Sequence, residues 1–149
     1  MGLMYGMLPL SRDIASMVSI PALRCLFVNP PMRDGTIYMK EIGRCGRRSI
    51  GGELWPQTGL AYLAAVARER GCPVQLFDAM ALGWAWEETV RRIKEFQPDL
   101  IVLLTTTPTF PNDAAFVRLL KGSLETRIAL VGTHVTALPS ESLDESDTD

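Results

Sequence analysis

The sequence is poor in the residues that hold most protein metal centres. Its 149 residues include one histidine, His134, and three cysteines, Cys25, Cys45 and Cys72, with no CxxC or CxxxCxxC spacing. Structural zinc sites and iron–sulfur clusters need closely spaced ligands, so we assign no metal ligand and expect this chain alone to hold neither. An odd number of isolated cysteines fits a reducing compartment, and we expect a cytoplasmic protein.

Long hydrophobic runs and an excess of positive charge are also missing. No apolar run reaches the ~20 residues that cross a bilayer, so no membrane span is predicted. The formal net charge is -2 at pH 7, which argues against a general nucleic-acid binder. Negative charge is concentrated at the C-terminus, where the last nine residues, ESLDESDTD, carry five acids.

Several motifs of common enzyme classes are absent. No GxGxxG follows the first predicted strand, and the chain has neither GxxxxGK[ST] nor GxSxG. These absences weigh against a dinucleotide-binding enzyme, a P-loop NTPase and an α/β-hydrolase. His134 has no serine, cysteine or carboxylate partner at motif spacing, so no catalytic residue is predicted.

Apolar runs alternate with helical patterns along the chain, which predicts an α/β fold. Strands are predicted over 23–28, 73–79, 100–107 and 127–131, and helices over 56–71, 86–99 and 111–124. Parallel strands joined by right-handed crossovers give a doubly wound, Rossmann-like (flavodoxin-like) sheet. The third strand is apolar throughout and is predicted to be central. Asn112 or Asp113 is the expected N-cap of the third helix.

The length fits one domain, with extensions at both ends. Residues 1–22 are Met-rich but lack a basic signal-peptide region, and we interpret them as an N-terminal extension. Residues 23–143 form the α/β domain. Residues 144–149 are an acidic tail or the start of a missing region, since four strands are visible and the chain stops where a fifth would follow.

The segment 32–55 is long and rich in basic residues. A loop of this length inside a compact domain is usually functional or disordered. It is either a lid that docks an anionic group or a solvated loop, and the second interpretation is slightly preferred.

Four stretches follow the predicted strands: NPPMRDG, DAMALGW, TTTPTFPND and GTHVTALP. In an open parallel sheet, ligands bind beyond the carboxyl ends of the strands, so all four should lie at the ligand edge. The hydroxyls of TTTPTFPND suit amide or phosphate oxygens, or the threonines simply end a strand while the prolines shape the turn. Asp78 matches a ribose-binding acid or a residue that caps the next turn.

Taken in order, LFVNPP, WPQTGLAYLAAVARERG, VQLFDA, FQPDLIVLLTTTPTF and ALVGTHVTALPSESL resemble the N-terminal cobalamin (B12)-binding domain of B12-binding radical SAM proteins. The group most similar to this chain includes anaerobic magnesium-protoporphyrin ester cyclases and hopanoid-related enzymes. The resemblance covers residues 23 to 145. It implies a corrin held against the strand ends, with a [4Fe–4S] cluster and S-adenosylmethionine bound by a separate barrel domain that is missing here.

The resemblance also implies which residues contact cobalamin. They lie after the second, third and fourth predicted strands and are Asp78, Thr105, Thr106, Thr107, Pro108, Thr109, Gly132, Thr133, His134 and Val135. The DxHxxG motif, whose histidine ligates cobalt in methionine-synthase-like domains, is absent after the first strand, so base-off binding is expected. His134 is then a rim or tail contact and not a metal ligand. The whole enzyme would catalyse methyl transfer or a radical cyclisation.

Two other functions stay open. A cofactor-free receiver-like or partner-docking module would need an acidic pocket after the first strand, and Asp34 alone does not supply one. A nucleotide-binding enzyme domain would need a glycine-rich first turn, which the sequence lacks.

Overall fold

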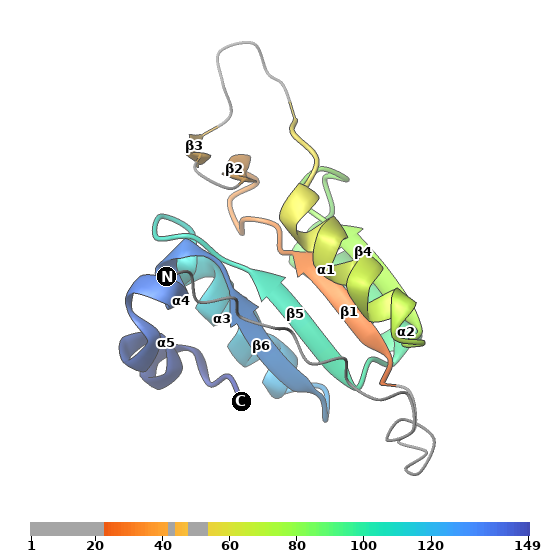
Figure 1. The fold of residues 1–149 in the computed structure, drawn as a ribbon. Helices are drawn as coiled ribbons and strands as arrows, with labels where there is room; N and C mark the ends of the chain where they lie inside the picture. The colour runs from red at the N-terminus through yellow and green to blue at the C-terminus, as the bar shows by residue number, and fades with distance from the viewer. Residues whose placement is uncertain (1–22, 42–43, 48–53) are drawn as a thin grey trace, which may run out of the picture.

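A four-stranded parallel sheet with helices on both faces forms the centre of the molecule. The computed structural model describes residues 23–41, 44–47 and 54–149. The strand order is β4-β1-β5-β6, and Figure 1 shows the four strands running side by side. The strands are β1 (Cys25–Asn29), β4 (Val74–Asp78), β5 (Leu100–Leu104) and β6 (Arg127–Val131). The α/β doubly wound fold is therefore confirmed, and β5 is internal as predicted.

The direction in which the chain winds across the sheet reverses between β1 and β5. The chain leaves β1 through α1 (Thr58–Glu69) to β4, then crosses back through α2 (Trp86–Phe96) to β5 on the other side of β1. It continues through α3 (Phe110–Lys121) to β6. Neighbouring crossovers on opposite faces leave a crevice at the carboxyl ends of the two central strands.

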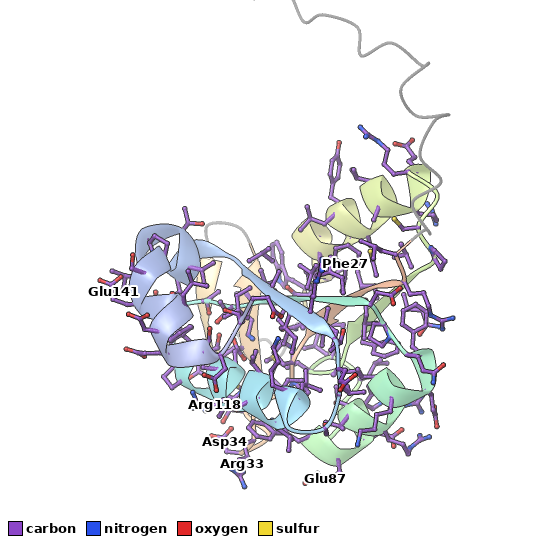
Figure 2. All side chains as sticks on the ribbon, turned by 90° about the horizontal axis from the view of Figure 1, so that it is seen from below. Phe27, Arg33, Asp34, Glu87, Arg118 and Glu141 are labelled. Carbon is purple, nitrogen blue, oxygen red and sulfur yellow. The ribbon has the colours of Figure 1, made fainter. Side chains whose placement is uncertain are left out.

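Alternate residues of each strand supply two hydrophobic cores. Cys25 and Phe27 of β1 pack with α1, whereas Leu26 and Val28 pack with α2 and α3. Figure 2 shows the sheet between α1 on one side and α2 and α3 on the other, with Glu87, Arg118 and Glu141 at the outside. Trp86 of α2 is buried in the larger core. A parallel sheet covered on both faces needs such apolar strands.

The segment 32–55 differs from the expected solvated loop. Two short antiparallel strands, β2 (Tyr38–Glu41) and β3 (Arg44–Arg47), form there, and Figure 1 places them beyond the carboxyl ends of the central strands. Lys40 of β2 is 2 % exposed, so at least this basic residue is not solvated. Residues 42–43 and 48–53 of this segment lie outside the described residues, as does the predicted extension 1–22.

The expected N-cap of the third helix is wrong. Helix α3 begins at Phe110 with Thr109 as its N-cap, so Asn112 and Asp113 lie within the first turn. Pro111 is compatible with this earlier start because the first turn of a helix needs no N–H at that position. The Asp113 carboxylate instead accepts hydrogen bonds from Lys40 and Thr109.

The stretch GTHVTALP is helical and is not a loop. It forms α4 (Thr133–Ala137), and α5 (Pro139–Ser146) follows directly. Helix α5 packs against α3 and runs across the domain boundary that the sequence suggested after residue 143. The backbone N–H of Asp149 donates to the Ile128 carbonyl at 3.1 Å, and its carboxylate accepts from the Ile128 N–H at 2.8 Å. The last residue thus pairs with the outer edge of β6.

Candidate functional site at the carboxyl edge of the sheet

A basic side chain of β2, Lys40, is buried at the end of β5. The Lys40 ammonium lies 3.0 and 2.9 Å from the two carboxylate oxygens of Asp113 and donates to the Leu104 carbonyl at 3.2 Å. Both side chains of the ion pair are completely buried. The ion pair with Asp113 and the bond to the Leu104 carbonyl hold β2 over the end of β5.

Residues 105–109 follow β5 and are called the threonine turn here. Most of the hydroxyl groups of this turn form hydrogen bonds within the fold. Thr109 donates its hydroxyl to Asp113 at 2.8 Å, and the Thr106 and Thr109 hydroxyl oxygens lie 3.0 Å apart. Since Thr109 gives its only proton to the carboxylate, the Thr106 hydroxyl is the donor in the second contact. Both hydroxyl protons are thus committed within the fold. Thr107 and Pro108 are exposed, and these two face solvent.

Thr105 has a different environment from the rest of the turn. It is fully buried, and its hydroxyl oxygen has no hydrogen-bond partner. The backbone of Gly132 approaches it closely: a Cβ on Gly132, whose φ is 130°, would lie 2.0 Å from the Thr105 carbonyl oxygen. Only glycine therefore allows the chain to turn from β6 into α4 at this position.

His134 is a packed residue of α4. Its ring stacks on Phe110 with the centroids 4.1 Å apart and the planes at 30°, and Nδ1 lies 3.3 Å from the Thr107 hydroxyl oxygen. The side chain is buried, while Thr133 beside it is exposed and Val135 half-buried. The imidazole thus joins α4 to the threonine turn and the start of α3.

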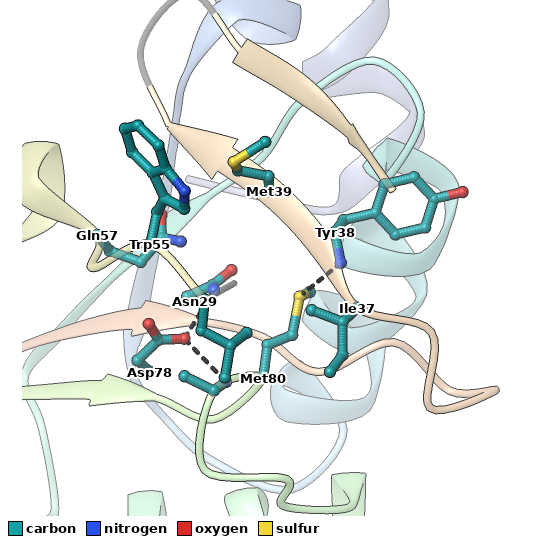
Figure 3. A pocket seen from close by; sticks show the side chains of 10 residues that line it. Asn29, Ile37, Tyr38, Met39, Trp55, Gln57, Asp78 and Met80 are labelled. Carbon is teal, nitrogen blue, oxygen red and sulfur yellow. Dashed lines mark hydrogen bonds between the residues drawn. The ribbon is translucent and has the colours of Figure 1, made fainter. Parts of the chain in front are cut away.

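A second group of polar side chains lies on the other side of β1. The Asn29 side-chain N–H donates to Asp78 Oδ1 at 2.8 Å, and the same carboxylate oxygen accepts from the Ala81 N–H at 3.2 Å. Gln57, the residue before α1, faces these two (Figure 3) and lines the same pocket. Asn29 Oδ1 and Gln57 Oε1 are buried without a hydrogen-bond partner. These are unsatisfied acceptors at the carboxyl edge.

The predicted residues therefore fall into two groups. Thr105, Gly132 and His134 lie together at the ends of β5 and β6, with the rest of the threonine turn beside them. Asp78 lies apart, at the end of β4 on the far side of β1.

The sequence argument did not predict Lys40, Asp113, Asn29 and Gln57 as site residues. Asn29 stands in the strand-end stretch NPP, and Gln57 stands in WPQTG at the start of α1, so position at a strand or helix end was the available signal.

Within 23–41, 44–47 and 54–149, no three histidine, cysteine or acidic residues are grouped closely enough to hold a metal ion. In the same part of the chain, no helix has the length and apolar character that a membrane span requires.

Comparison with known proteins gives a family and one relative for this chain. A family model described as B12 binding domain matches residues 45–149. An uncharacterized methyltransferase of Pyrococcus horikoshii, PH0819, is 28% identical over 99 residues, which is 66% of this chain and 21% of that protein. The chain thus spans about a fifth of the length of this relative. No solved structure matches the chain significantly.

Proposed function

Because the chain belongs to the B12-binding domain family, we propose that it holds cobalamin at the carboxyl edge of its sheet as the cofactor-binding part of a radical SAM enzyme. The observation that supports cobalamin binding is the family match over residues 45–149, which includes β4, β5 and β6. Ligands of open parallel sheets bind at this edge, and the residues that follow these strands are the proposed contacts.

The side chains at this edge fit the chemistry of a corrin. A corrin has apolar faces and a rim of carboxamides, so it needs both apolar contacts and hydrogen-bond acceptors. Half-buried Leu104 and Val135 provide apolar surface. Unpartnered buried oxygens of Thr105, Asn29 and Gln57 provide acceptors. A buried acceptor without a partner destabilises a fold by about 1–3 kcal/mol, so a ligand that donates to these oxygens would be favoured.

Base-off binding is the proposed mode. The loop after β1 reads NPPMRDG and contains no histidine, and the chain's single histidine is His134 on α4. That imidazole is stacked on Phe110 and in contact with Thr107. It is therefore occupied at the β6 end of the site. The stretch NPPMRDG, which begins at the last residue of β1, offers asparagine, arginine and aspartate side chains, none of which is the usual lower ligand of cobalt.

The reaction of the whole protein extends this proposal beyond the chain described here. Bound cobalamin supplies a cobalt centre that carries a methyl group or supports a radical reaction. The name methyltransferase belongs to the relative from Pyrococcus horikoshii, and it supports methyl transfer as the reaction class, with radical cyclisation as the second. The [4Fe–4S] cluster and S-adenosylmethionine would be bound by a separate barrel domain. A CxxxCxxC motif within about a hundred residues downstream in the coding sequence would support that context, and its absence would contradict it.

A titration with hydroxocobalamin tests the binding proposal. We expect saturable binding, retention of the cofactor after desalting, and the absorption spectrum of base-off cobalamin. A spectrum identical to that of the free cofactor, with no retention, would contradict the proposal. Binding with a base-on spectrum would support cobalamin binding and refute the proposed mode.

A further inference from the structure

The pocket at the ends of β1 and β4 is small, and three of its lining side chains carry acceptor oxygens. Asn29, Gln57 and Asp78 supply its oxygens, and Trp55, Met39 and Met80 are among its other lining residues (Figure 3). Its volume is about 10 Å³, roughly the space that one water molecule needs. It can therefore receive the end of a group, such as an NH₂ or OH, and not a ring or a phosphate.

The orientation of Asn29 is fixed by its neighbour. Its side-chain NH₂ donates to Asp78 Oδ1 at 2.8 Å, and turning the amide over would bring two oxygens together. Asn29 Oδ1 is therefore the atom left without a partner, and the residue is 1 % exposed. Gln57 is 6 % exposed and its Oε1 also lacks a partner. Two buried amide oxygens and a carboxylate demand a donor and repel an anion.

We propose that this pocket is a subsite for a neutral hydrogen-bond donor of the ligand, namely the NH₂ of a primary carboxamide on the corrin rim. This inference rests on the proposed cobalamin binding. The pocket lies across β1 from the threonine turn, so it would fix a part of the rim that the β5 and β6 residues do not reach. The acceptors of the pocket would also exclude the phosphate of the nucleotide tail from this side of β1.

Gln57→Met provides a test with two opposite expected changes. Methionine has nearly the same size but no acceptor, so the apo-protein loses an unsatisfied buried oxygen. Its free energy of unfolding in urea should stay equal or rise. Affinity for dicyanocobinamide, a corrin that keeps the amides and lacks the nucleotide, should fall about tenfold, the effect of about 1.4 kcal/mol. Gln75→Met is the matched control, because Gln75 is exposed on β4, and it should change neither quantity.

A change in the ligand tests the same subsite without altering the protein. Cobyrinic acid carries carboxylates where cobinamide carries amides, so it should bind the wild type at least tenfold more weakly. This discrimination should shrink in Gln57→Met, since one repelling oxygen is gone.

Three results would distinguish a failure of this inference from a failure of the proposed cobalamin binding. Unchanged cobinamide affinity in Gln57→Met, together with lower stability, would mean that the pocket holds a structural water only and would overturn the inference. Equal affinity of the wild type for cobinamide and cobyrinic acid would overturn it as well. A wild type that binds neither cobalamin nor cobinamide would instead refute the proposed function, and the inference with it.

Discussion

Lys40 of β2 and Asp113 of α3 form an ion pair whose side chains are both completely buried. Residues separated by most of the domain in sequence meet here at the end of β5, where Lys40 also donates to the Leu104 carbonyl. Desolvating two charges is costly, and such a pair is tolerated only when further hydrogen bonds satisfy it. Thr109 and Asn112 supply these bonds to the carboxylate. The pair therefore couples the position of β2 to the threonine turn.

Replacing Lys40 with methionine should destabilise the protein strongly. The Asp113 carboxylate would remain buried without its cation, which costs about 3–5 kcal/mol. Urea denaturation measures the change. The double variant Lys40→Met/Asp113→Leu should recover most of the loss, because no charge then stays buried. Lys121→Met is the control: its ion pair with Asp149 is partly exposed, so the effect should stay below about 1 kcal/mol. A loss in Lys40→Met as small as that of the control would show that the pair is solvated.

Gly132→Ala should destabilise the turn between β6 and α4. The new Cβ would lie 2.0 Å from the Thr105 carbonyl oxygen, and the φ of 130° is itself unfavourable for alanine. We expect a loss of more than about 1 kcal/mol in the free energy of unfolding. Gly71→Ala separates the two causes, since Gly71 has a φ of 84° but nothing within 4 Å of its Cβ position. Equal losses in both variants would assign the effect to backbone conformation alone.

The sequence predicted the sheet because its strands are short apolar runs that alternate with helical patterns. Burial on both faces requires such runs, so β5 and β6 were found within a few residues of their observed bounds. The helical form of residues 133–137 was not predicted, since His134, Thr136 and the preceding Gly132 look like a loop. Its stability comes from tertiary contacts such as the stacking of His134 on Phe110, which no local pattern records.

The site was predicted only in outline. Strand order places the ends of β5 and β6 side by side, and this follows from the α/β pattern. The burial of Lys40 does not follow, because its partner Asp113 is 73 residues away and charged residues are ordinarily exposed. The burial of the unsatisfied oxygens of Asn29 and Gln57 likewise depends on the positions of β2 and of the start of α1. Only the three-dimensional structure defines these positions.

The stability of α2 should depend on pH through Glu88. Hydrogen bonds from Arg91 and Arg92 lower the pKa of this carboxyl from 4.5 to about 2. A lowered pKa means that Glu88 contributes stability above pH 4.5 and that this contribution is lost as the pH falls towards 2. Glu88→Gln should therefore flatten the decline of stability between these pH values, as measured by urea denaturation.

Glu87→Gln is the control for this pH dependence. It removes the neighbouring acid of the first turn of α2 and leaves the contacts of Glu88 with both arginines in place. The steep decline should persist in this variant. Identical pH profiles for Glu88→Gln and the wild type would show that the ion pairs do not form in solution.

His134→Gln tests whether the chain's single histidine is a contact on the rim of the site or a ligand of cobalt. Glutamine keeps a hydrogen-bonding side chain but loses the ring that stacks on Phe110, so a stability loss of about 0.5–1.5 kcal/mol is expected. Affinity for cobalamin should fall about tenfold or less, the effect of one hydrogen bond of ~1 kcal/mol. Thr107→Val is the matched control, because it removes the partner of Nδ1 and leaves the stacked ring.

The EPR spectrum of the Co(II) form in ¹⁵N-labelled protein decides between the two roles of His134. We expect no splitting from a protein nitrogen, because the imidazole is already packed between Phe110 and Thr107. A labelled-nitrogen splitting that is present in the wild type and lost in His134→Gln would make His134 an axial ligand and refute the rim assignment.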